Sequence, residues 1–198
     1  MTYRHDLTAQ ITADRVIGII RAPDAETAIA QTRRLTTAGL STIEISLTTP
    51  GALDAVRELA GTLIGVGTVL DEHQAASALE AGAAFLVCPT LSPQVIRAAH
   101  RHGAPVVAGA ATPTEIVQAL EAGADLVKLF PATTYGPDGL RAIRQALPQA
   151  PLVPTGGVSP STAPAWLAAG AVAVGMGGDL TRATTPEIAT LLKTLQTP

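Results

Sequence analysis

The feature that most constrains the fold is the alternation of short apolar runs with longer helical segments along the whole chain. Most of the helical segments begin with a capping residue, a proline or an acidic residue, and several end in glycine, the residue favoured just past a helix. Strands that are almost continuously apolar are buried on both faces, as in parallel sheets covered by helices. The apolar runs lie at residues 16–20, 42–47, 63–67, 84–88, 105–109, 125–130, 151–156 and 171–175.

Eight strands, each followed by a helix, predict a (β/α)8 barrel of the α/β class. The first helix-terminating glycines recur about every 20–22 residues, and ALEAGA occurs at both 78–83 and 119–124. A helix at about residues 4–13 is expected to close the bottom of the barrel. No linker divides the chain, so residues 1–198 are expected to form one domain. The absence of a strong Gly-x-Gly-x-x-Gly sequence disfavours the alternative, an open doubly wound sheet.

Composition excludes several functional classes. The net charge is −3 over 198 residues and no Lys/Arg-rich run occurs, so we expect no nucleic-acid partner. There is no apolar stretch of 18 residues and no apolar leader, which favours a cytoplasmic protein without membrane contact. The single cysteine, Cys88, is expected to be a small core residue. The four histidines form no ligand pattern, so no metal is expected.

Lysine usage points to one candidate catalytic residue. The chain has 11 arginines but only two lysines, and Lys128 lies within the apolar run DLVKLF. Strand alternation places Leu126, Lys128 and Phe130 on one face. If that face points inward, an apolar surrounding disfavours the ammonium and leaves a nucleophilic amine suited to Schiff-base formation. The structural alternative is a lysine that reaches solvent or pairs with a carboxylate.

Glu44 is the candidate partner of Lys128. In TIEISL, Glu44 lies on the face opposite Ile43 and Ile45, and an inward carboxylate is costly unless it is paired or functional. The two residues lie on even-numbered strands, and alternate strands contribute side chains to the same layer of such a barrel. Glu44 can therefore move protons beside the amine, although a purely structural ion pair remains an alternative.

Two glycine-rich loops predict an anion site. PTGGVSP contains Thr155, Gly156 and Gly157 after the seventh strand, and GMGGD contains Gly177 and Gly178 after the eighth. Glycine lets backbone N–H groups approach an anion, and these two loops form the usual phosphate site of the architecture. The alternative is a pair of tight turns.

Other candidates lie at the ends of the remaining strands. Arg21 ends the first strand, where its guanidinium can hold a substrate carboxylate, or it is a surface arginine. Thr68 follows the third strand and Pro89 follows the fourth.

The sequence resembles the class I aldolases of 2-keto-3-deoxy-6-phosphogluconate (KDPG), which overlap in activity with the 4-hydroxy-2-oxoglutarate (KHG) aldolases. The motifs that carry the resemblance are GIIR (18–21), IEISLTTP (43–50), IGVGTV (64–69), PTEIVQALEAGADLVKLFP (113–131) and VPTGGVSP (153–160). It implies a homotrimer of (β/α)8 barrels, with Lys128 as the Schiff-base lysine and Glu44 as the acid/base. It places Thr68 and Arg21 near the pyruvate carboxylate, and Pro89 and Phe130 along the pocket. Thr155, Gly156 and Gly157 would hold the distal part of the substrate.

The implied reaction is the reversible cleavage of the phosphorylated keto-deoxy sugar acid to pyruvate and glyceraldehyde 3-phosphate, without a cofactor because the iminium accepts the electrons. Cleavage of KHG to pyruvate and glyoxylate is a possible second activity. Two positions depart from the family: Thr48 stands where some members have an arginine, and Gly178 where a serine is frequent. Phosphate binding is then expected to rest on backbone N–H groups.

Three alternatives stay open at this point. The substrate can be the epimer 2-keto-3-deoxy-6-phosphogalactonate, which differs at one stereocentre. The protein can instead be a phosphate-binding barrel that isomerises or transfers a phosphorylated metabolite, or a ligand-binding paralogue without activity.

Overall fold

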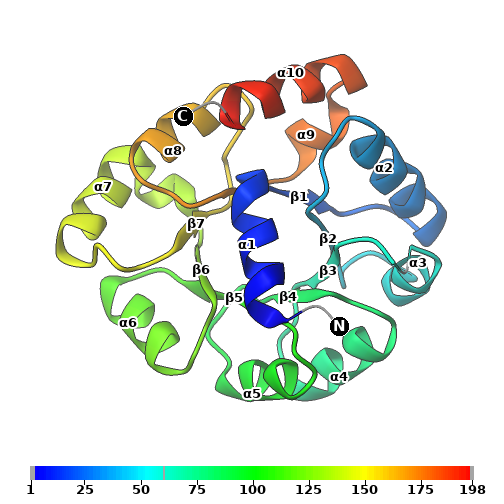
Figure 1. Cartoon of the computed structure of the whole chain (residues 1–198), viewed down its shortest axis with the longest axis horizontal. Helices are drawn as coiled ribbons and strands as arrows, with labels where there is room; N and C mark the ends of the chain where they lie inside the picture. Colours follow the sequence, from blue (N-terminus) through cyan, green and yellow to red (C-terminus); the bar gives the residue numbers. More distant parts are fainter. Residues whose placement is uncertain (1–2, 60, 197–198) are drawn as a thin grey trace.

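The computed structural model describes residues 3–59 and 61–196 as one parallel β-barrel surrounded by helices (Figure 1). The strands are β1 (Val16–Ile20), β2 (Ile43–Ser46), β3 (Ile64–Gly67), β4 (Phe85–Val87), β5 (Val106–Ala110), β6 (Leu126–Leu129), β7 (Leu152–Pro154) and β8 (Val174–Met176). The helices are α1 (Arg4–Asp14), α2 (Ala25–Thr37), α3 (Ala52–Glu58), α4 (Glu72–Glu80), α5 (Pro93–Arg101), α6 (Pro113–Glu121), α7 (Gly136–Ala146), α8 (Ala163–Ala168), α9 (Gly178–Arg182) and α10 (Thr185–Gln196), with a short 3-10 helix, η1 (Ala132–Thr134).

The strand order confirms the predicted barrel. Every neighbouring pair is parallel, in the order β7-β6-β5-β4-β3-β2-β1-β8. An isolated parallel bridge between Thr155 and Gly175 joins the two ends of this order, so the sheet closes on itself. Because all strands run the same way, the residues that follow them gather at one end of the barrel.

Local sequence explains where the helices begin and end. The Asp24 side chain accepts a hydrogen bond from the backbone N–H of Thr27 at the start of α2, and Asp71 accepts one from that of Gln74 at the start of α4. At the other ends, the predicted terminal glycines all have positive φ, which glycine adopts without steric cost. These are Gly39, Gly61, Gly82, Gly103, Gly123 and Gly170.

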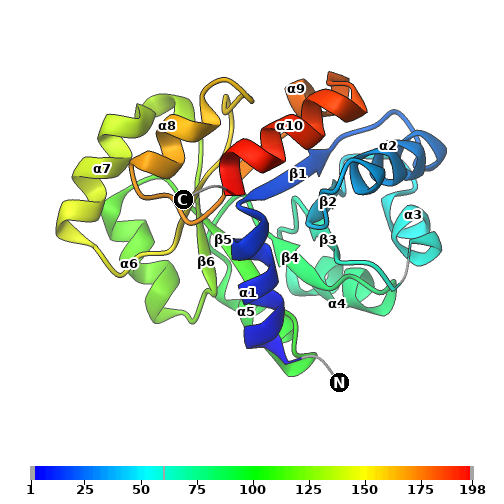
Figure 2. The same ribbon diagram turned by 45° about the horizontal axis from the view of Figure 1, so that its top comes forward.

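The predicted N-terminal helix is present and covers the amino-terminal end of the barrel (Figures 1 and 2). Arg4 at its start forms an ion pair with Asp125, just before β6, at 3.0 Å. Asp14 at its end accepts a hydrogen bond from Thr42, just before β2, at 2.6 Å. Between them, Ile11 packs into the barrel interior, and this closure leaves the carboxyl ends of the strands as the open face.

The boundary of the last strand was predicted wrongly. The apolar run at 171–175 suggested a strand there, but β8 is Val174–Met176. Ala173 is fully buried in the barrel interior, so the beginning of the run is apolar because it packs in the core and not because it pairs as a strand.

Candidate active site

Lys128 lies inside the barrel, so the face that it shares with Leu126 is the inward one. It sits on β6 between Gly109 of β5 and Val153 of β7, and only 3% of the residue is exposed. Its Nζ atom lies 5.3 Å from the centroid of the Phe130 ring, within the range of a cation–π contact. The lysine therefore does not extend into solvent, which removes one structural alternative.

The Glu44 side chain points from β2 into the same interior and lies against the neighbouring strand, β3. A Cβ atom at Gly67 of β3 would lie 1.6 Å from Glu44 Oε1 and 2.2 Å from its Cδ, so only glycine leaves room for this carboxylate. Glu44 is 1% exposed. Although both side chains are described, no ion pair joins Glu44 to Lys128, and the simple structural pair is not formed.

The electrostatics of Glu44 suit a group that gains and loses a proton. Burial raises the pKa of the Glu44 carboxyl above its ordinary value, while the charges of Lys128 and Arg21 act in the opposite direction. Its Oε1 atom is buried and has no hydrogen-bond partner among the described residues. A raised pKa brings the two protonation states closer in free energy near neutral pH, as acid–base catalysis requires.

A cluster of hydroxyl groups lies two residues beyond Glu44. Ser46 Oγ is 2.8 Å from both Thr48 Oγ1 and Thr68 Oγ1, and Ser46 is fully buried. Thr68 has a φ of 63°, a left-handed conformation that is strained for a residue with a Cβ. Such strain is found preferentially where a fold positions a functional group. Thr48 thus joins the site through a hydrogen bond rather than through a charge.

Predicted residues that follow the first, sixth, seventh and eighth strands meet around one cavity of about 220 Å³, whereas Lys128 and Glu44 do not line it. Gly156 and Gly157 have φ values of 90° and 77°, which glycine alone adopts readily. The lining includes seven residues predicted from the sequence: Arg21, Phe130, Thr155, Gly156, Gly157, Gly177 and Gly178.

Pro89 lines a second cavity, of about 310 Å³. Phe130 lines both cavities. Pro89 and Thr68 are thus not brought into the 220 Å³ cavity, although both lie at the same end of the barrel.

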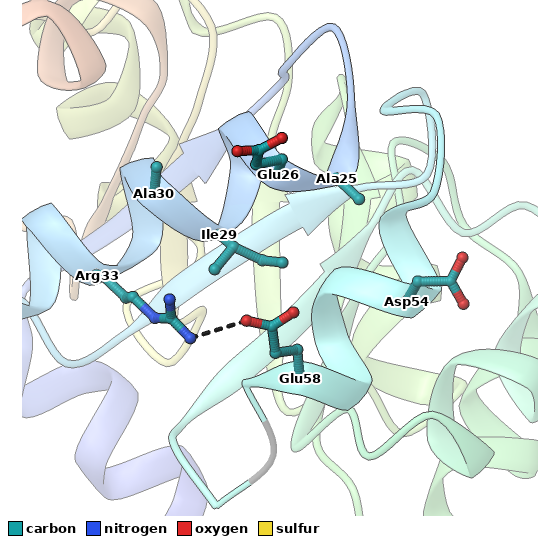
Figure 3. A pocket seen from close by; sticks show the side chains of 7 residues that line it. All are labelled: Ala25, Glu26, Ile29, Ala30, Arg33, Asp54 and Glu58. Atoms are coloured by element: carbon teal, nitrogen blue, oxygen red, sulfur yellow. Dashed lines mark hydrogen bonds and ion pairs between the residues drawn. The ribbon is translucent and has the colours of Figure 1, made fainter.

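A larger cavity, of about 510 Å³, lies away from the barrel mouth between α2 and α3 (Figure 3). Its polar groups include Arg33 and Glu58, which form an ion pair with each other at 2.8 Å. None of the site residues predicted from the sequence lines it, so size alone does not identify the site.

Cys88 is a core residue, in agreement with the sequence prediction. It is fully buried, and burial raises the pKa of its thiol to about 12. The thiol therefore stays protonated and unreactive near neutral pH. Within residues 3–59 and 61–196, no three His, Cys, Asp or Glu side chains are grouped so as to hold a metal ion, and no helix is long and apolar enough to cross a membrane.

Two contributors were not predicted, Ser46 and Arg182. Ser46 shares a face with Glu44 by simple alternation, so its position was open to prediction. Arg182 lines the 220 Å³ cavity from α9, and nothing in the sequence pattern indicates that it does so. Asp179, the last residue of the predicted GMGGD loop, lines the same cavity.

Comparisons of the sequence with known proteins all point to one family. Residues 7–193 match the family described as "KDPG and KHG aldolase". The chain is 36% identical over 174 residues to 2-dehydro-3-deoxy-6-phosphogalactonate aldolase of Escherichia coli K12, covering 85% of each chain. It is 38% identical over 149 residues to 2-dehydro-3-deoxy-phosphogluconate aldolase of Treponema pallidum, covering 73% of this chain and 71% of that one.

A solved structure adds a chemical observation. The KDPG aldolase of Legionella pneumophila, with pyruvate captured as a covalent carbinolamine intermediate, superposes with a TM-score of 0.82 at 27% identity, covering 98% of each chain. The barrel, the buried lysine and these relatives define a class I aldolase, a lyase that forms a covalent Schiff-base intermediate with pyruvate. The chain belongs to the KDPG/KHG aldolase family. This membership excludes the non-aldolase barrel considered from the sequence.

Proposed function

We propose that this aldolase reversibly cleaves KDPG to pyruvate and glyceraldehyde 3-phosphate. The observation that carries the proposal is the burial of Lys128 and Glu44 together in the barrel, near a cavity bordered by an arginine and glycine-rich loops. An amine, a carboxyl of raised pKa and an anion site are the groups that this reaction needs.

Lys128 and Glu44 carry the chemistry in this proposal. The Lys128 amine adds to the C2 carbonyl to form a carbinolamine, which takes a proton from the Glu44 carboxyl and loses water to give an iminium. Glu44 then takes the proton of the C4 hydroxyl. The C3–C4 bond breaks, its electron pair enters the iminium to form an enamine, and the aldehyde leaves. Glu44 returns the proton to C3, and water hydrolyses the pyruvate iminium, whose released proton goes back to Glu44. No cofactor is required, because the iminium accepts the electrons.

Arg21 and Thr68 are proposed to bind the pyruvate carboxylate. Arg21 lines the 220 Å³ cavity, and its charge acts to lower the pKa of the Glu44 carboxyl. A guanidinium binds a carboxylate through two parallel hydrogen bonds. The Thr68 hydroxyl is held by Ser46 at 2.8 Å. Pro89 and Phe130 would shape the pocket around the substrate.

The distal phosphate is assigned to the loops after β7 and β8. Thr155, Gly156, Gly157, Gly177 and Gly178 border one cavity there. Their backbone N–H groups can approach an anion closely because four of the five positions carry no side chain.

Borohydride reduction tests the covalent step. Incubation with pyruvate and reductant should add one pyruvate-derived group to Lys128, located by peptide mass spectrometry. A protein that stays unmodified, while a known aldolase of the family is modified in the same conditions, would contradict the proposed mechanism.

The epimer preference needs a separate experiment. The related aldolases include enzymes for both the phosphogluconate and the phosphogalactonate substrate, so the galactonate epimer is the second candidate. Both epimers form from pyruvate and glyceraldehyde 3-phosphate, and the configuration at C4 of the condensation product therefore distinguishes them. KHG cleavage is tested by the release of glyoxylate. A homotrimer and a cytoplasmic location stay predictions from the sequence.

A further inference from the structure

The outer rim of the 220 Å³ cavity carries a second arginine that the mechanism above does not use. Arg182, at the end of α9, lines this cavity together with Asp179 and Gly178. A Cβ atom at Gly178 would lie 3.0 Å from Arg182 Nη1, so the guanidinium lies directly beside the backbone of the loop after β8. The positive charge of Arg182 thus lies next to a glycine backbone, which has no side chain to donate a hydrogen bond.

The present partner of Arg182 leaves its charge available. Arg182 Nη2 forms an ion pair with Asp179 Oδ1 at 2.5 Å, and the two side chains are 74% and 52% exposed. Ion pairs this exposed contribute little to stability, so a stronger anion can share or replace the carboxylate. A phosphate dianion is such a ligand, because it accepts two parallel, charge-assisted hydrogen bonds from a guanidinium.

We propose that Arg182 binds the phosphate group of the substrate and confers the preference for a phosphorylated aldehyde. This inference rests on the proposed function, since it assigns the distal end of the same cavity. The two arginines border one cavity from different strands: Arg21 follows β1 and affects the pKa of Glu44, whereas Arg182 lies beside the loop after β8. This arrangement fits a substrate with a carboxylate at the reacting end and a phosphate at the other.

Two variants that break the same ion pair separate phosphate binding from a structural role. Arg182→Gln removes the cation, whereas Asp179→Asn removes the anion and keeps the cation. The assay is condensation of pyruvate with glyceraldehyde 3-phosphate and, in parallel, with glyceraldehyde, and the readout is the ratio of the two kcat/KM values. Borohydride trapping of pyruvate on Lys128 is measured in every variant.

The two variants should shift the ratio differently. Arg182→Gln should lower the preference for the phosphorylated aldehyde by about 10- to 150-fold, the range for a lost hydrogen bond to a charged group. Asp179→Asn should raise this preference by about 1.4- to 5-fold, because it removes a surface carboxylate whose negative charge repels the phosphate. An unchanged preference in Asp179→Asn also supports the proposal, since the cation is still present.

Two results would overturn the proposal. One is a loss of phosphate preference in Asp179→Asn as large as in Arg182→Gln. This would show that the ion pair between Arg182 and Asp179 serves to hold α9 in shape. The other is an equal effect of Arg182→Gln on both aldehydes. The proposed function fails separately, through the absence of pyruvate trapping in the parent protein.

Discussion

Replacing Gly67 by alanine should slow proton transfer strongly while leaving Lys128 in place. The added Cβ would lie 1.6 Å from Glu44 Oε1 and 2.5 Å from its Cγ, so the Glu44 side chain must leave its present position. Overpacking of this kind costs about 1–3 kcal/mol of stability. Loss of a positioned acid–base group lowers the rate by about 10²–10⁴-fold. The variant should therefore fold but turn over slowly.

Gly65→Ala is the matched control on the same strand. Its Cβ would lie 2.4 Å from the Phe85 ring, so it overpacks the same interior and the side chain that must move first is Phe85, not Glu44. Urea unfolding compares the stability of the two variants, and borohydride trapping of pyruvate reports the reactivity of Lys128. Exchange of the pyruvate methyl protons in heavy water, followed by NMR, reports proton transfer at C3 without any aldehyde.

The expected result is a specific defect in Gly67→Ala. Trapping should persist and exchange should fall by about 10²–10⁴-fold, whereas Gly65→Ala should lose stability and keep most of its exchange. If Gly67→Ala exchanges pyruvate protons as fast as Gly65→Ala, then the position of Glu44 over β3 is not what proton transfer requires, and the reasoning is refuted.

The other predictions concern the charged residues of the site. Lys128→Ala should abolish cleavage and pyruvate trapping and keep the circular dichroism spectrum of the parent; a loss of only a few-fold in turnover would contradict covalent catalysis. Arg21→Ala should weaken pyruvate binding by about 10- to 150-fold and Arg21→Lys less so, measured by pyruvate titration, and unchanged affinity would mean that the carboxylate binds elsewhere. Glu44→Gln should slow proton transfer by about 10²–10⁴-fold with trapping retained. The same variant should unfold at higher urea than the parent at pH 8. Because the pKa of Glu44 is raised in the folded protein, ionisation above its ordinary value of 4.5 destabilises the fold, and the difference in stability should shrink as the pH falls toward 4.5.

Several properties of this protein were determined by local sequence alone. The barrel followed from eight apolar runs separated by helices, and the helix ends followed from terminal glycines such as Gly39 and Gly82, which have positive φ in the structure. The two-residue period of a strand placed Leu126, Lys128 and Phe130 on one face and Glu44 opposite Ile43 and Ile45, although it did not decide which face points inward. Each of these depends on residues close together in the chain.

The arrangement of the site was decided only by the tertiary structure. Glu44 leans over Gly67 because β2 and β3 are neighbours, and the hydroxyl of Ser46 meets that of Thr68 for the same reason. Arg182 reaches the cavity lined by Gly156 because the barrel closes between β7 and β8. These contacts join segments 20 or more residues apart, and periodicity along one strand carries no information about the side chain opposite it. The sequence therefore singled out Lys128 and Glu44 as candidates, whereas barrel closure brought Arg182 and the glycine-rich loops together around one cavity.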